Sequence, residues 1–325
     1  MMLTGSAILR LIVDEVGRHY PELLPPGVVK PDYVRSAVAP DKLKQHVLDA
    51  TYEAQGPAAI LRIGQGLERA GYTPIWHLML SAQGPISMLG KWFGLEESAA
   101  ARFRIDYKPH PSGMAVDVRH YTLFGPPSRV TESLLICGVH LSIFKRLGCT
   151  GLRCFLTPEN AAEIPLFDNG DMVAGHEKLD VSAGRWRVEW SGFEPAAARH
   201  GQPSSITPAL PLLADYDDPT DVIHPALSII GQDLSCNWKV EDLALRLRMS
   251  RRSLQRHLQQ SQASFSLLVR AARVREASKL LSGTPAPITD IGYRCGFSDS
   301  AHFARDFRKS VGVSPSAYRR LALIA

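Results

Sequence analysis

Three polar side chains near the carboxyl terminus have the types and the spacing needed to read DNA bases. Arg252, Gln255 and Arg256 are three and four residues apart, so a helix would place them on one face. Arginine can donate two hydrogen bonds to guanine O6 and N7, and glutamine can both donate to and accept from adenine. We therefore expect this face to contact base edges in a major groove.

A helix that presents those side chains must bury its opposite face. Leu254 and Leu258 are four residues apart and supply that apolar face. Residues 240–247 form a short helical pattern before a turn at 248–249, and Ser250 is the expected N-cap of the second helix. A short helix, a turn and a second helix together predict a helix-turn-helix unit.

The same pattern occurs twice in the last third of the chain. Val240 aligns with Ile288 at an offset of 48, whereas Leu254 aligns with Phe303 at an offset of 49, because Ser298 is an additional residue in the second turn. The alternative is an unrelated all-α domain whose charged helix faces are merely solvated. Two units at matched offsets favour a tandem helix-turn-helix domain instead.

The second unit offers fewer hydrogen-bond donors than the first. Ala301 stands where Arg252 stands in the first unit, and Asp299 is the expected N-cap. We expect the second helix to supply backbone anchoring and shape recognition, with one base contact by Arg305. The residues predicted to contact DNA are Ser250, Arg251, Arg252, Gln255, Arg256, Ser300, Ala301, His302, Arg305 and Arg308.

Charge is divided unevenly along the chain. Residues 238–325 contain 16 Lys and Arg against 6 Asp and Glu, a net +10, whereas the remainder has 21 against 26, a net −5. A cationic module favours a polyanionic partner through counterion release. We expect that partner to be double-stranded DNA.

A connecting helix is predicted between the two units, over residues 265–281. At 1.5 Å per residue it spans about 25 Å, enough to hold two reading helices about one duplex turn apart. One subunit would then read two successive major grooves.

The front part of the chain mixes helical and strand patterns. Residues 103–107 and 114–118 alternate apolar and polar side chains and suggest a hairpin. The predicted fold class is therefore an α+β N-terminal domain joined to an all-α C-terminal domain with two helix-turn-helix units and a connecting helix. The expected divisions are 1–200 for the first domain, 201–221 for a proline-rich linker, and 222–325 for the DNA-binding domain, with its units at 240–258 and 288–308.

The carboxyl-terminal region resembles the AraC/XylS family of bacterial transcription regulators. The resemblance is carried by one run of residues in the second unit. The run consists of Ile288-Thr289-Asp290-Ile291-Gly292-Tyr293, then Cys295-Gly296-Phe297-Ser298-Asp299, then 302–309, with Gly312, Pro315 and Tyr318. Residues 1–200 are similar, in length and order of elements, to the arabinose-binding-like domain of the OruR and VirS type. The resemblance implies that this domain dimerises and binds an effector.

Enzyme, metal and membrane signals are weak. Gly64-Gln65-Gly66 lacks the third glycine of a dinucleotide loop, and His176-Glu177 lacks the second histidine of a zinc-protease helix. The five cysteines form no Cys-x-x-Cys pair, which suits reduced thiols. We expect no cofactor, no enzyme activity, no membrane partner and a cytoplasmic location.

Some side chains of the front domain remain open to two interpretations. Trp186, Trp190, Phe193 and Tyr107 could line a ligand pocket, although core packing is the simpler explanation. Cys149 and Cys154 could sense oxidants, but inert core thiols are commoner.

These observations lead to one hypothesis and two alternatives. The chain is expected to be a homodimeric, DNA-binding transcription regulator of the AraC type, activator or repressor, whose front domain dimerises and binds a small effector, with RNA polymerase as a further candidate partner. In the first alternative the front domain is only a protein-interaction or oligomerisation module. In the second alternative the front domain is an enzyme fused to a DNA-binding domain.

Overall fold

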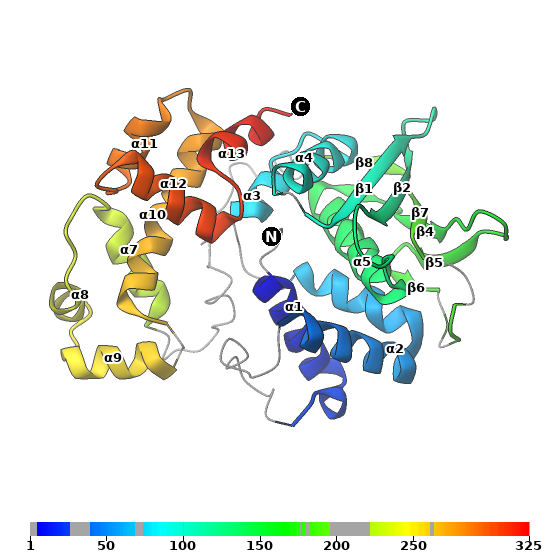
Figure 1. Cartoon of the computed structure of the whole chain (residues 1–325), viewed down its shortest axis with the longest axis horizontal. Coiled ribbons are helices and arrows are strands. Elements are labelled where there is room, and N and C mark those ends of the chain that lie inside the picture. Colours follow the sequence, from blue (N-terminus) through cyan, green and yellow to red (C-terminus); the bar gives the residue numbers. More distant parts are fainter. Residues whose placement is uncertain are drawn as a thin grey trace. The chain divides into compact units, whose positions relative to one another are not determined.

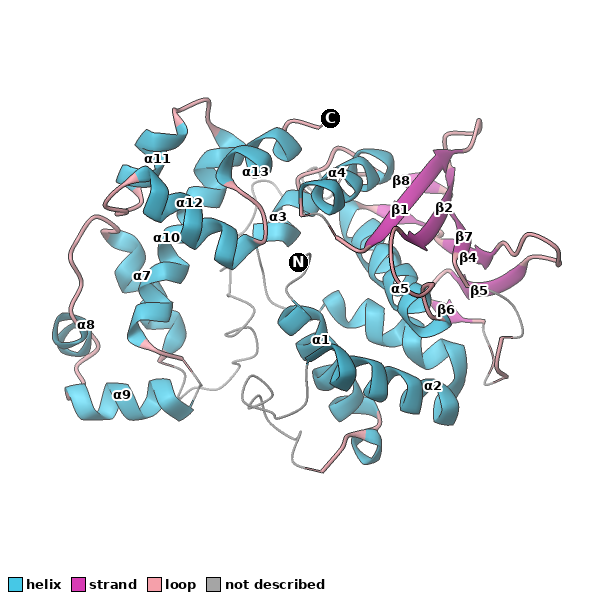
Figure 2. Ribbon diagram, in the orientation of Figure 1, coloured by secondary structure: helices cyan, strands magenta, loops and turns pink. Residues whose placement is uncertain are grey.

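The computed structural model describes residues 5–26, 40–68, 74–99, 101–173, 175, 177–179, 183–195, 222–260 and 263–324. The chain divides into two compact units. The amino-terminal unit comprises Met1–Arg69 and Met79–Ser204, with Ala325, and the carboxyl-terminal unit comprises Ala70–Leu78 and Ser205–Ile324. The strands of the described chain all lie in the first unit (Figure 2).

The amino-terminal unit begins with helices. Their bounds are α1 Gly5–His19, η1 Pro21–Leu23, α2 Pro40–Gln65, η3 Gly66–Glu68, α4 Pro85–Ser98 and α5 Val130–Leu147. Helix α2 is broken at Gly56, whose φ is 72°, just before Pro57. Helices α2 and α5 pack very closely, because a Cβ at Gly138 would lie 2.3 Å from the backbone oxygen of Leu61.

Among the described residues, six strands form one antiparallel sheet in the order β1-β2-β7-β4-β5-β6. Their bounds are β1 Phe103–Pro109, β2 Ala115–Thr122, β4 Arg153–Leu156, β5 Ile164–Asp168, β6 Asp171–Met172 and β7 Arg185–Glu189. The short strands β3 Cys149–Thr150 and β8 Gly192–Phe193 pair separately. The predicted hairpin is present, with Ile105 opposite His120.

Helix α5 covers one face of this sheet (Figure 1). The ring of His140 lies 5.8 Å from that of Trp186, and the rings of Phe144 and Trp190 lie 5.9 Å apart. Sγ of Cys137 lies 3.5 Å from Sγ of Cys154. Trp186 and Trp190 are therefore core residues, and the Cys149 thiol is also buried, which raises its pKa to about 12.

The carboxyl-terminal unit is helical throughout its described part. Its helices are α7 Ile223–Gln232, α8 Val240–Arg246, α9 Arg251–Gln260, α10 Phe265–Gly283, α11 Ile288–Arg294, α12 Ser300–Val311 and α13 Pro315–Ala322. Segment Ala70–Leu78, which contains most of α3 (Pro74–Leu80), belongs to the same unit. The buried Tyr318 donates a hydrogen bond from its hydroxyl to the backbone oxygen of Pro74 at 2.7 Å.

The architecture is thus an α+β region with a sheet followed by a helical region, as the sequence predicts. The predicted linker at 201–221 lies outside the described residues, as does His176. In the described part of the chain, no helix combines the length and apolarity that crossing a membrane requires.

Candidate nucleic-acid interface

The first helix pair consists of α8 and α9, joined by a tight turn. Arg248 lies in this turn with φ of 56°, in the left-handed region that non-glycine residues rarely adopt. The backbone N–H of Arg248 donates to Leu245, and that of Met249 donates to Ala244 at 2.9 Å. These hydrogen bonds close the carboxyl end of α8, and the chain then turns toward α9.

The second helix pair consists of α11 and α12 and has the same turn. Gly296, the equivalent of Arg248, has φ of 81°. Its N–H donates to Tyr293, and the N–H of Phe297 donates to Gly292 at 3.0 Å. The matched hydrogen bonds show that the repeat in the sequence is also a repeat in backbone geometry.

Helices α9 and α12 each have the N-cap expected from the sequence. Oγ of Ser250 accepts from the backbone N–H of Ser253 at 3.0 Å, and Oδ1 of Asp299 accepts from that of His302 at 2.7 Å. The hydrogen bond from His302 is the main reason that the pKa of Asp299 lies below its usual value.

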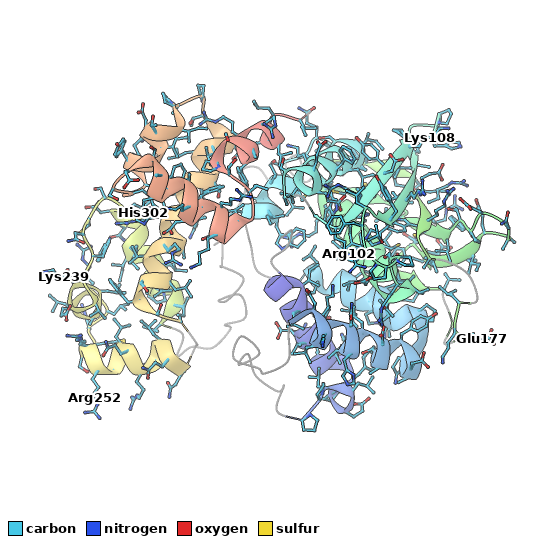
Figure 3. The ribbon with its side chains drawn as sticks, in the orientation of Figure 1. Arg102, Lys108, Glu177, Lys239, Arg252 and His302 are labelled. Carbon is cyan, nitrogen blue, oxygen red and sulfur yellow. The ribbon has the colours of Figure 1, made fainter. Side chains whose placement is uncertain are left out.

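The two faces of α9 are sharply different. Leu254 is fully buried and Leu258 nearly so. Arg252, Gln255 and Arg256 are exposed, and within the described chain none of them has an ion-pair or hydrogen-bond partner. Figure 3 shows Arg252 projecting away from α9. These three side chains are free to contact a ligand.

Two other predicted contact residues have structural roles in the free protein. Nη1 of Arg251 forms an ion pair with Oε1 of Glu241, on α8, at 2.7 Å. The hydroxyl of Ser250 is occupied as the helix cap. The cap role of Ser250 was expected from the sequence, whereas the ion pair of Arg251 was not, because Glu241 comes from the preceding helix.

Helix α12 buries Phe303 and Phe307 and exposes Arg305 and Arg308. His302 is held on three sides. Its Nδ1 lies 3.2 Å from Oγ of Ser298, its Nε2 lies 3.4 Å from Oδ2 of Asp306, and its ring packs edge-on against Phe297. Ser300 and Ala301 are exposed at the first turn. Of the predicted contact residues on this helix, Arg305 and Arg308 are the cations that have no ion-pair or hydrogen-bond partner among the described residues.

Helix α10 connects the two pairs and contributes arginines that the sequence analysis did not single out. Nε of Arg270 lies 3.2 Å from Oδ2 of Asp306, which ties α10 to α12. Arg273 is half-buried over the ring of Phe297, donates to the backbone oxygen of Cys236 at 3.4 Å, and has its pKa lowered by burial. The spacing of charged residues along one helix does not indicate contacts with residues that are distant in the sequence.

The arrangement can support recognition of a long polyanion. The two helix pairs lie toward opposite ends of α10 (Figure 1), and its 19 residues span about 28 Å at 1.5 Å per residue. Free arginine and glutamine side chains can bond base edges, while the remaining cations can contact phosphates. Across the residues described, no group of His, Cys, Asp or Glu side chains could hold a metal ion.

Part of the chain is similar to known proteins. Residues 243–321 match a family model described as "Helix-turn-helix domain". The chain is 24% identical over 148 residues to the TCP pilus virulence regulatory protein of Vibrio cholerae, covering 46% of this chain and 50% of that one. It is 39% identical over 85 residues to the transcriptional activator RhaS of Escherichia coli, covering 26% of this chain and 30% of that one.

Among solved structures, the DNA-binding domain of AdpA in complex with a target DNA is similar at a TM-score of 0.28 and 28% identity. That likeness covers 31% of this chain and 92% of the AdpA chain. The chain thus spans half or less of the length of the two curated relatives described above.

Proposed function

We propose that the whole chain is a sequence-specific, DNA-binding transcription regulator of the AraC type. The match of residues 243–321 to a helix-turn-helix family model and the similarity to the activator RhaS support this proposal. The observation that carries the proposal is the face of α9. Its three free polar side chains stand opposite a buried leucine pair, on a helix that is capped and anchored through a turn found twice in the same unit.

The two helix pairs are inferred to be two helix-turn-helix units that dock in successive major grooves. In this arrangement α9 reads base edges with Arg252, Gln255 and Arg256, because these side chains match the donor and acceptor patterns of guanine and adenine. Helix α12 supplies mainly phosphate contacts from Arg305 and Arg308, since His302 is already held by Ser298 and Asp306.

We further infer that the amino-terminal unit serves as a dimerisation and effector-binding domain, within the proposed division at 1–200, 201–221 and 222–325. A dimer would place two such DNA-binding domains on two half-sites. RNA polymerase is the partner through which an activator of this type would act. A front domain that is only a protein-interaction module is the second candidate.

The test compares binding to a selected sequence with binding to random sequence. Duplexes are first selected from a random pool with the full chain, and affinities are then measured by fluorescence anisotropy at a fixed salt concentration. Arg256→Ala is expected to lose about 1–3 kcal/mol on the selected duplex at one base pair. On random duplex the loss should be much smaller.

Lys279→Ala provides a matched control. Lys279 is an exposed cation on α10 that pairs with Glu276 at 3.4 Å, so its removal should change both affinities little and equally. Equal losses on selected and random duplex for Arg256→Ala would refute the base-reading role. Failure of the full chain to enrich any sequence would refute the proposed function.

A further inference from the structure

The amino-terminal unit contains a cavity of about 720 Å³ at the end of strand β2. Its wall is built from the last residues of β2, the loop that follows, the loop between β4 and β5, and the start of β7. Small-molecule sites in proteins have volumes of about 300–1,000 Å³. The cavity is therefore large enough for a small organic ligand.

The described part of β7 pairs with β2 only as far as Arg119. Arg119 lies opposite Arg185, the first residue of β7, and the N–H of His120 donates to the backbone oxygen of Gly184 at 2.7 Å. Alternate residues of an antiparallel strand direct their N–H groups to the same side. Thr122 therefore directs its backbone N–H beyond the end of β7, where the described chain provides no strand to accept it.

The two arginines of the wall differ in how they are compensated. Arg185 forms an ion pair with Glu159 across the cavity. Arg119 lies over the ring of Tyr121, 5.2 Å from its centroid, and faces Asp106 across the β1–β2 pair, but it forms no ion pair with a carboxylate of the described residues. The hydroxyl of Thr122 is also buried without a hydrogen-bond partner among the described residues. The wall thus presents one guanidinium outside any ion pair, that of Arg119, and one buried hydroxyl without a partner, that of Thr122, among the described residues.

His120 adds a fixed polar group to the same wall. Its ring is 5% exposed and stacks on Phe103, and its Nδ1 lies 3.0 Å from Oγ of Ser133 and 3.1 Å from Oγ of Ser128. Burial lowers the pKa of His120 to about 4, so the imidazole is neutral near pH 7. In the tautomer that carries the proton on Nε2, Nδ1 accepts a hydrogen bond from one of these hydroxyls.

We propose that this cavity binds a small organic carboxylate, with its charge on the Arg119 guanidinium. A monoanion fits better than a phosphate, because Glu159 stands in the wall and residues 1–237 have a net charge of −5. Pro127, Pro158 and Tyr121 offer apolar surface to the organic part. The effector role of this ligand rests on the proposed function.

The test is calorimetric titration of the full chain with 4-phenylbutanoate, its neutral amide, and inorganic phosphate. The carboxylate should bind, and the amide and phosphate should bind at least about tenfold more weakly. Arg119→Gln should weaken carboxylate binding about tenfold or more. Glu159→Gln should strengthen it, because Arg185 is then released. Ala161→Trp should block the cavity without changing its charge.

Arg153→Gln is the matched control. Arg153 is also an exposed strand arginine over an aromatic ring, that of Phe155, but it lies outside the cavity wall. This variant should bind as the wild type does. Absence of carboxylate binding at millimolar concentration, equal binding of the amide or phosphate, or an Arg119→Gln affinity equal to that of wild type would each overturn the site.

DNA affinity measured on the same preparations separates this proposal from the proposed function. A bound carboxylate that changes DNA affinity supports the effector role. A carboxylate that binds at this site without changing DNA affinity keeps the site and overturns its role as an effector site. A chain that selects no DNA sequence would refute the proposed function, while the binding result would still decide the site.

Discussion

The turns of the two helix pairs predict opposite effects for substitutions at equivalent positions. Arg248 has φ of 56° and Gly296 has φ of 81°. A left-handed conformation costs an L-residue about 1–2 kcal/mol, and replacing that residue by glycine removes this cost. The greater freedom of glycine in the unfolded chain cancels about 0.5–1 kcal/mol of the stabilisation. Arg248→Gly should therefore stabilise the first pair by about 0.5–1 kcal/mol.

Gly296→Ala should have the opposite sign and a larger size. It adds the same left-handed strain, and its Cβ would lie 1.9 Å from the backbone oxygen of Leu234. Because that contact is with backbone, no side-chain rotation can relieve it. We expect a loss of at least about 2 kcal/mol in the stability of the second pair.

Hydrogen exchange measured by mass spectrometry on the full chain, without DNA, reports on each pair separately. Peptides from 240–260 should exchange about two- to fivefold more slowly in Arg248→Gly, and peptides from 288–311 at least about 30-fold faster in Gly296→Ala. Faster exchange in Arg248→Gly would refute the reasoning from backbone strain. Unchanged exchange in Gly296→Ala would refute the close packing of that turn on Leu234.

Two further predictions concern titrating groups. Burial lowers the pKa of His140 to about 3, and neither ring nitrogen has a partner among the described residues. Between pH 6.5 and pH 3 the unfolded chain binds a proton at His140 and the folded chain does not. The free energy of unfolding therefore falls as pH drops from 6.5 toward 3. His140→Phe should flatten that fall in urea unfolding at stepped pH, whereas an unchanged slope would contradict the burial argument. For Asp299, whose pKa is lowered, the stabilisation is present above 3.8 and is lost as pH falls through its folded value. Asp299→Ala should speed exchange in α12 at pH 7, whereas Asp299→Asn should retain most protection because asparagine also caps helices; equal exchange in the two variants would contradict the capping role.

Features that depend on local spacing could be predicted from the sequence. The apolar pairs Leu254 with Leu258 and Phe303 with Phe307 are buried, and Ser250 and Asp299 cap the helices that follow. These features need only the helical period and the chemistry of the cap. The same holds for the hairpin of β1 and β2, which alternation and turn residues indicate.

Features that depend on distant contacts could not be predicted in this way. The inclusion of segment Ala70–Leu78 in the carboxyl-terminal unit, where Tyr318 bonds to Pro74, has no local signal. The ion pair that holds Arg251 joins it to Glu241 on the preceding helix, so its residue type alone suggested a free DNA contact. The left-handed Arg248 was equally hidden, because arginine gives no turn signal and only its repeat partner is a glycine.

Protection of guanine N7 from dimethyl sulfate, on a duplex selected by the full chain, tests the central claim most directly. Two helices reading successive major grooves should protect N7 atoms in two stretches about 10 base pairs apart for each subunit. Arg256→Ala should remove protection in the stretch read by α9 and leave the other stretch in place. Protection confined to one stretch per subunit, or an Arg256→Ala pattern identical to wild type, would contradict the account.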